Sequence, residues 1–260
     1  MNIDWSDLRT ELAEWQARGL RLPVWWRDDD AVAPTPALSR LTKLSARTGM
    51  PVHLAVVPRP ATPDLAAFVA DNAPIIPVVH GWAHENHALP DAKKSEFGTA
   101  VPRARHDIQL AISTARDLFG ARLAPMFVPP WNRIAPDLYP DLVSAGFDMV
   151  STFTPRKIVQ PVPHLTQINT HLDPIDWRGT RGQIAPEIVI AGLVAQLRDR
   201  RTGDADASEP FGLLTHHLVH TEDVWDFTAQ CIEEISQGPV DRFRADHRPP
   251  SPACRVKDLA

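Results

Sequence analysis

Apolar and polar residues alternate along the chain in blocks that predict a repeated strand–helix order. Short apolar runs are typical of buried strands, whereas apolar residues three or four positions apart predict amphipathic helices. The predicted strands cover 22–26, 52–57, 75–79, 125–128, 147–152, 166–170 and 211–215. The predicted helices cover 4–18, 35–49, 62–69, 103–118, 137–145, 186–200 and 221–235. This alternation indicates an α/β fold with a parallel sheet covered by helices, open or closed into a barrel.

No linker interrupts this order, so we expect one domain over residues 1–237. The chain has 260 residues, 43% of them hydrophobic, which is ordinary for a globular protein that buries a sizeable core. Residues 238–260 are rich in proline and arginine, and we expect a loosely ordered tail there.

The charge balance and the cysteine content exclude several classes of protein. The net charge of -5 argues against a nucleic-acid binder, which would carry a basic stripe. No apolar run has the roughly 18 residues that a membrane span needs. The chain has 2 cysteines and no secretory pattern near its first residues, so we expect a cytoplasmic protein.

Unusual polar clusters follow five of the predicted strands. In parallel α/β folds the carboxyl ends of the strands meet at one rim, and active sites form there. The clusters are Asp28-Asp29-Asp30, His80 with His84 and His87, Pro129-Pro130-Trp131-Asn132, Asp173 with Asp176-Trp177-Arg178, and His216-His217. We therefore expect these side chains to line one cleft.

His80 and His84 have a spacing that suits metal binding. A separation of four residues puts two imidazoles on one face of a helical turn, and two histidines with a carboxylate commonly bind a divalent first-row metal. The alternative is a pair of loop histidines held by backbone groups. His87 is either a third ligand or, as we favour, a group that supports the ligands.

The three consecutive aspartates allow two interpretations. Like charges this close raise each other's pKa unless a cation offsets them, which favours a role beside a metal. One carboxylate would then bind the metal and another would accept a proton from an attacking water. The alternative is a solvated turn, with Asp30 capping the next helix.

The other strand-end residues are ambiguous when each is taken alone. Pro130 and Trp131 are typical of a packing turn, but an aromatic wall also stacks on sugar rings. Asp176 and its neighbours are typical of a salt-bridged loop. His216 is either a general acid or a strand-end histidine bonded to the backbone.

In their order along the chain, these motifs resemble those of the polysaccharide deacetylases, the NodB-homology proteins of carbohydrate esterase family 4. The resemblance covers roughly residues 22 to 220 and implies a distorted (β/α)7 barrel with a divalent metal held by Asp-His-His. It implies that Asp29, His80 and His84 bind the metal, zinc in the first place, with nickel, cobalt or manganese as alternatives. Because Asp30 replaces the family's usual glycine, the register of the triplet stays open by one position.

The remaining roles are implied by the same resemblance. Asp28 would be the catalytic base and His216, from Leu214-Thr215-His216, the general acid. Asp176 and Arg178 would assist catalysis. Pro130, Trp131 and Trp177 would contact the substrate. The likeness is closest to the intracellular WbmS-like branch.

Two departures from the family pattern change what we expect. Gly81 stands where the family has a hydroxyl residue, and Val128 stands where it has an arginine that orients the base. Arg178 is our first candidate to replace that arginine and Arg133 our second, with Arg27 a further candidate.

The resemblance implies a metal-dependent hydrolase that removes an acetyl group from an N-acetylated sugar or sugar precursor. Its partner would be a small-molecule or carbohydrate substrate. The alternatives are a binding or scaffold protein that has lost catalysis, or a hydrolase of another non-peptide C–N bond. Metal content and acetate release distinguish the enzymes from the scaffold.

Overall fold

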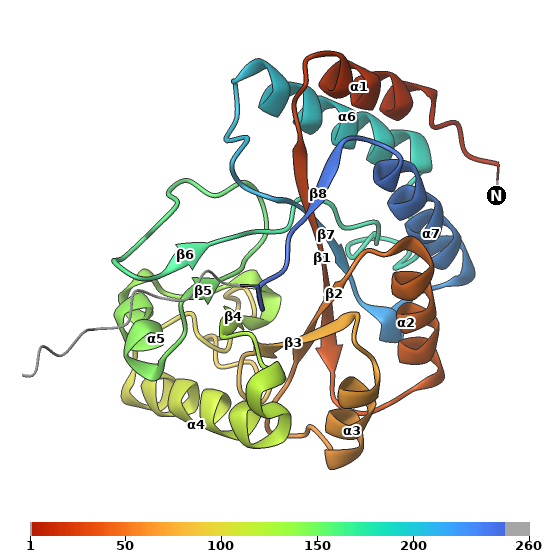
Figure 1. Cartoon of the computed structure of the whole chain (residues 1–260). Coiled ribbons are helices and arrows are strands. Elements are labelled where there is room, and N and C mark those ends of the chain that lie inside the picture. The colour runs from red at the N-terminus through yellow and green to blue at the C-terminus, as the bar shows by residue number, and fades with distance from the viewer. Residues whose placement is uncertain (1, 248–260) are drawn as a thin grey trace, which may run out of the picture.

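The computed structural model describes residues 2–247, and its centre is one parallel sheet (Figure 1). Seven strands lie in the order β6-β5-β4-β3-β2-β1-β7, and every neighbouring pair is parallel. They are β1 (Leu22–Ala31), β2 (Val52–Val56), β3 (Ile75–His80), β4 (Met126–Val128), β5 (Met149–Val150), β6 (Thr166–Gln167) and β7 (Phe211–Thr215). The expected α/β fold with seven alternating strands is confirmed.

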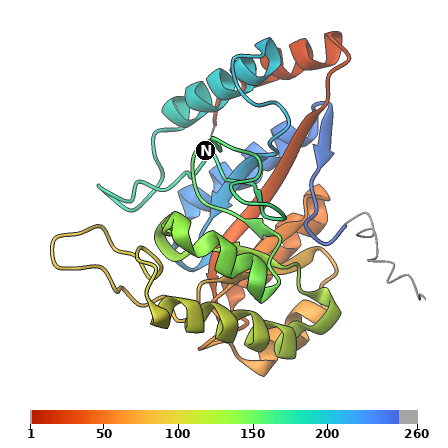
Figure 2. The same cartoon turned by 90° about the vertical axis from the view of Figure 1, so that its left-hand side faces the viewer.

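Seven α-helices of the described part cover the outer face of this sheet (Figures 1 and 2). They are α1 (Ser6–Ala17), α2 (Pro36–Thr48), α3 (Pro63–Asp71), α4 (Pro102–Phe119), α5 (Tyr139–Ala145), α6 (Pro186–Thr202) and α7 (Glu222–Ser236), with the 3-10 turns η1 (Gly120–Arg122) and η3 (Pro136–Leu138). Thr35 and Thr62 cap the helices that follow them, each with proline in the first turn. No helix within residues 2–247 combines the length and the apolar character of a membrane span.

The segment after β6 joins the two ends of the sheet. Ile168 and Thr170 donate backbone hydrogen bonds to Val150 and Thr152, on the side of β5. Leu172 pairs with Leu213 of β7. These bonds curl the sheet, so its strand ends surround a common rim.

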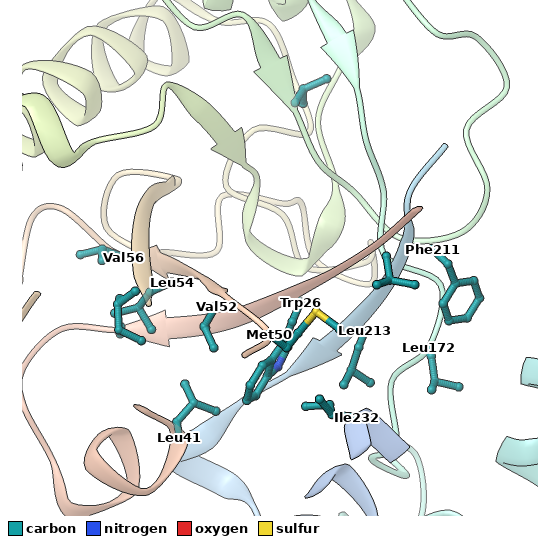
Figure 3. Packing of buried hydrophobic residues seen from close by; sticks show 14 of the residues in the cluster. Trp26, Leu41, Met50, Val52, Leu54, Val56, Leu172, Phe211, Leu213 and Ile232 are labelled. Carbon is teal, nitrogen blue, oxygen red and sulfur yellow. The ribbon is translucent and has the colours of Figure 1, made fainter. Parts of the chain in front are cut away.

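Consecutive residues of β1 point to opposite faces of the sheet, as they must in a strand. Trp26 packs on the helix side with Met50, Leu213 and Ile232 (Figure 3). Trp25 lies on the inner face. A fully buried side chain of this kind stabilises the fold by about 1.5–3 kcal/mol.

The structure corrects three expectations about the elements. β1 continues to Ala31, so the three aspartates lie inside the strand and not after it. β5 and β6 are each two residues long, shorter than the predicted 147–152 and 166–170. The expected tail begins with an ordered strand, β8 (Val240–Arg242), which pairs with β1; residues 248–260 lie outside the described part.

Candidate metal centre and active site

A β-bulge at the end of β1 decides which aspartates face the rim. Asp28 pairs with Leu54 and Ala31 with Val56, so three steps along β1 match two steps along β2. Asp30 takes the left-handed backbone conformation, with φ of 75°, which aspartate tolerates better than most residues. Bulges of this kind re-aim side chains next to active sites. Here the bulge interrupts strict alternation, so Asp29 and Asp30 can both turn toward the rim.

Asp30, His80 and His84 form the cluster of potential metal ligands. The Oδ1 atom of Asp30 lies 3.1 Å from His80 Nε2 and 3.3 Å from His84 Nε2. One ligand atom from each residue lies within 4.8 Å of the other two. His80 Nδ1 donates to the carbonyl of Val128, which fixes the ring and directs Nε2 at the Asp30 carboxylate. The structure thus groups the two predicted histidines with Asp30, and not with Asp29.

A tight turn, and not the expected helical turn, brings the two imidazoles together. His80 is the last residue of β3, and Gly81 and His84 both have left-handed backbones, with φ of 59° and 57°. The buried Glu96 accepts backbone hydrogen bonds from Trp82, Ala83 and His84 and so holds this turn. A Cβ atom on Gly81 would come within 2.3 Å of Glu96 Oε2, so the turn requires glycine there. This explains the departure from the family pattern at Gly81.

The charges around the cluster keep Asp30 ionised. Burial opposes the ionised form, but the hydrogen bond and the charge of His80, together with smaller electrostatic contributions from the other two rim histidines, outweigh burial and lower the pKa of Asp30. For His84, burial and the neighbouring His80 lower the pKa, which favours the neutral imidazole that binds metals.

Asp29 is held by Arg27 on the same face of β1. Arg27 Nη2 donates to Asp29 Oδ2 at 3.0 Å, and Arg27 Nε lies 2.9 Å from Asp29 Oδ1 as a charge contact. Arg27 also donates to Ser151 Oγ and Asn132 Oδ1, both at 2.7 Å. Both members of the pair are buried. Asp29 is therefore a carboxylate of fixed orientation beside the Asp30–histidine cluster.

Asp28 points to the opposite face and makes structural contacts. Its carboxylate accepts hydrogen bonds from Thr215 Oγ1 at 2.6 Å and from the backbone of His217 at 3.0 Å, and it pairs with His217 Nδ1. Burial opposes ionisation of Asp28, but the adjacent His217 outweighs it and lowers the pKa. Asp28 ties β1 to η4 (His217–Val219), and both of its carboxylate oxygens are engaged there.

His216 lies on the rim with Trp177 and Asp173. The rings of His216 and Trp177 meet edge to face, with centroids 4.7 Å apart. Trp177 Nε1 donates to Asp173 Oδ2 at 2.7 Å. Burial raises the pKa of Asp173, while the charge of His216 opposes that rise. His216 Nδ1 is buried without a hydrogen-bond partner in the described residues.

Trp131 closes the other side of the histidine cluster. It lies in η2 (Pro130–Asn132), and its ring centroid is 4.3 Å from that of His84. Trp131 and Asn132 both have left-handed backbones, with φ of 56° and 57°. Two such residues in succession cost energy and are typical of functional sites. Pro130 is buried beneath Trp131 and packs against the Gly81 turn.

Three residues that we expected at the site lie elsewhere. Asp176 accepts backbone hydrogen bonds from Gly179 and Thr180 and caps its own exposed loop. Arg178 is exposed in that loop, and Arg133 Nη1 donates to the carbonyl of Lys94. Neither arginine forms an ion pair in the described residues; Arg27 is the arginine that contacts a rim aspartate.

His87 donates toward the Glu96 carbonyl and stands outside the ligand cluster.

Sequence reasoning missed Glu96 and the importance of Asp173. Glu96 is 12 residues beyond His84 in a loop without a recognisable pattern, so no sequence signal marks it. Asp173 belongs to the polar cluster after the sixth predicted strand, but the resemblance assigns the catalytic role in that cluster to Asp176, next to Trp177.

The residues present fit a divalent metal. Two imidazoles and one carboxylate form the donor set of common catalytic sites, and their ligand atoms already converge. Three protein ligands leave further positions for water or substrate.

No protein-family model matches the sequence, and no curated protein matches it. Among solved structures, one from Mycobacterium smegmatis, provisionally described as a polysaccharide deacetylase, is similar with a TM-score of 0.60 at 17% identity, over 79% of this chain and 73% of that chain. A family 4 carbohydrate esterase pseudoenzyme from Bacillus anthracis is similar with a TM-score of 0.51 at 12% identity, over 85% of this chain and 63% of that chain. At such identities the likeness concerns the fold, and the WbmS-like branch stays a prediction. The chain has the fold of the polysaccharide deacetylases of carbohydrate esterase family 4.

Proposed function

We propose that this protein is a metal-dependent hydrolase that removes the acetyl group from an N-acetylated sugar or sugar precursor. The observation that carries the proposal is the convergence of Asp30, His80 and His84 beside a carboxylate, Asp29, that Arg27 holds in place. Asp30, His80 and His84 would hold the metal. When bound, a divalent metal supplies a Lewis acid that polarises the amide carbonyl and makes water a better nucleophile.

Asp29 acts as the general base in this proposal, in place of Asp28. Asp28 has both oxygens engaged by Thr215 and His217 on the far face of β1, so it cannot reach an attacking water. Asp29 lies on the inner face, and Arg27 and the bulge fix its direction. A general base must first lie within hydrogen-bond distance of the group whose proton it removes, and its pKa matters only once that condition is met.

In this proposal His216 acts as the general acid, and Trp131 and Trp177 form the walls of the substrate cleft. His216 carries a free, buried Nδ1 and lies against Trp177. An imidazole there can protonate the leaving amine. The backbone N–H of Trp131, next to the metal cluster, is our candidate donor to the developing oxyanion. The exposed face of Trp177 offers a surface on which a sugar ring can stack.

The scaffold alternative rested on the missing arginine at Val128. The contact between Arg27 and Asp29 favours the enzyme over the scaffold, because a guanidinium reaches the rim carboxylate from two residues earlier on the same strand. We also keep the cytoplasm as the proposed location, because the buried Cys231 is a free thiol.

The test is acetate release from a panel of N-acetylated mono- and oligosaccharides by protein reconstituted with zinc, cobalt, nickel or manganese. We expect release that is abolished by a chelator and restored by metal. Asp29→Asn is the matched control, since it keeps the side chain's size and removes the base. A fully metal-loaded protein that releases no acetate from any sugar would contradict the proposal.

A further inference from the structure

A hollow next to Asn132 and Thr152 is lined mostly by cationic and neutral polar side chains and by no carboxylate. Its wall includes Lys93, Asn132, Arg133, Tyr139 and Thr152. Its volume is about 490 Å³. That volume lies in the range of small-molecule sites, roughly 300–1,000 Å³.

Two residues of this wall contact the arginine that holds the proposed base. Asn132 Oδ1 accepts from Arg27 Nη2 at 2.7 Å, and the Thr152 carbonyl accepts from Arg27 Nη1 at 3.3 Å. Arg27 in turn contacts Asp29. The side chain of Arg27 therefore lies between the wall of the hollow and Asp29.

The two cations of the wall have no acidic partners. Within residues 2–247, no ion pair includes Lys93 or Arg133. Arg133 Nη1 donates to the carbonyl of Lys94 at 2.7 Å, which anchors the guanidinium and leaves its other N–H groups for a ligand. The whole chain has a net charge of -5, so the positive hollow does not follow from a generally basic surface.

The neutral groups of the wall can donate as well. Asn132 uses its oxygen on Arg27, so its amide nitrogen is left to donate. Burial raises the pKa of Tyr139, so its hydroxyl stays protonated. The wall thus offers a guanidinium, an ammonium, an amide and a phenol, all of which donate to oxygen atoms.

We propose that the hollow binds an anionic group of the substrate, so that the substrates are N-acetylated sugars that also carry a carboxylate or a phosphate. The inference rests on the proposed function, because it places this group on the same sugar. Arginine recognises carboxylate and phosphate oxygens with a fork of parallel donors, and unpaired cations in a cleft attract anions. A neutral sugar would leave both cations unpaired.

The test is calorimetric binding of three probes to the full-length, metal-reconstituted protein: N-acetylglucosamine, its uronic acid and its 6-phosphate. We expect at least one anionic probe to bind about tenfold or more tightly than the neutral sugar, since hydrogen bonds to charged groups are the strong ones. The two anionic arms show whether the hollow prefers carboxylate or phosphate. Equal affinity for all three probes would overturn the proposal.

Substitutions in the wall test whether the preference for anionic probes arises in the hollow. Arg133→Gln and Lys93→Gln should each reduce the preference, while Lys94→Gln, in the same loop (yellow in Figure 2) but outside the wall, should keep it. Arg133→Lys should retain part of the preference, and it serves if the glutamine variant does not fold. A preference that survives both wall substitutions would overturn the assignment.

Acetate release from the same probes separates the two proposals. Tight, Arg133-dependent binding of an anionic sugar without acetate release supports the hollow and contradicts the proposed function. Acetate release without any preference for the anionic probes supports the proposed function and overturns the inference about the hollow.

Discussion

Arg27 and Asp29, two positions apart on one face of β1, form a buried ion pair. Nη2 of Arg27 is 3.0 Å from Oδ2 of Asp29, and its Nε is 2.9 Å from Oδ1. The intervening Asp28 points to the opposite face, toward Thr215 and His217. The alternation along the strand therefore turns Arg27 and Asp29 toward the rim and Asp28 toward the opposite face, where it makes structural contacts.

The arginine should be essential for both catalysis and stability. Arg27→Lys keeps the charge but loses the planar fork, so we expect kcat to fall by about 10²-fold or more while metal content is unchanged. Arg27→Met leaves Asp29 as an unpaired buried charge and should reduce the free energy of unfolding by about 3–5 kcal/mol. Kinetics and denaturant unfolding measure the two effects. Wild-type turnover in Arg27→Lys would show that this contact does not position the base.

His216 should affect turnover without affecting the metal. Replacing a general acid typically lowers the rate by about 10²–10⁴-fold, so His216→Asn should lose that much kcat while elemental analysis finds the same metal content. A poorer amine leaving group depends more on the acid than an activated one. The variant should therefore recover part of its activity on an acetyl ester with a good leaving group. Loss of metal from His216→Asn would identify it as a ligand and contradict its role.

The turn at Gly81 should not tolerate a side chain. An alanine Cβ there meets Glu96 Oε2 at 2.3 Å and Pro130 at 2.5 Å, at a φ of +59°. We expect Gly81→Ala to destabilise the protein by about 1–3 kcal/mol and to weaken metal binding, because the turn sets the position of His84. Gly192→Ala is the control, since Gly192 lies in α6 and an added Cβ would meet nothing within 4 Å. That variant should be as stable as the wild type or slightly more stable.

His53 should make the protein less stable as the pH falls. It donates to the Trp26 carbonyl and accepts from the Ala245 N–H, both at 3.0 Å, and burial lowers its pKa to about 4 from 6.5. Between these values the unfolded chain takes up a proton that the folded chain refuses. His53 therefore contributes stability above pH 6.5 that is lost progressively toward pH 4, up to about 3 kcal/mol at roughly 1.4 kcal/mol per pKa unit.

Denaturant unfolding at pH 7 and pH 5.5 measures this effect. His53→Gln should be less stable than the wild type at pH 7 but should lose about 1 kcal/mol less between the two pH values. His106→Gln, at an exposed position on α4, should keep the wild-type slope. Equal slopes for the wild type and His53→Gln would rule out His53 as the source.

The sequence predicted the fold well because apolar periodicity reports burial directly. It also predicted that His80 and His84 lie together beside a carboxylate, and the structure places them beside Asp30, although through a tight turn and not a helical one. It left the register of the three aspartates open by one position and favoured Asp29 beside the histidines, whereas the structure places Asp30 there, because the bulge between Asp28 and Ala31 is a property of strand pairing that a single sequence does not encode. The sequence also could not single out Arg27 among the candidate arginines, because only the extension of β1 through the aspartates puts its side chain beside Asp29.

Metal content and acetate release, measured together for the wild type, Asp30→Asn and Asp29→Asn, show which aspartate binds the metal and which acts as the base. Both substitutions remove one negative charge at adjacent positions and keep the side chain's size, so each is the control for the other. We predict that Asp30→Asn loses most of its metal and its activity, whereas Asp29→Asn keeps a full equivalent of metal and loses only activity. Full metal content in Asp30→Asn together with its loss from Asp29→Asn would contradict Asp30 as the ligand and Asp29 as the base.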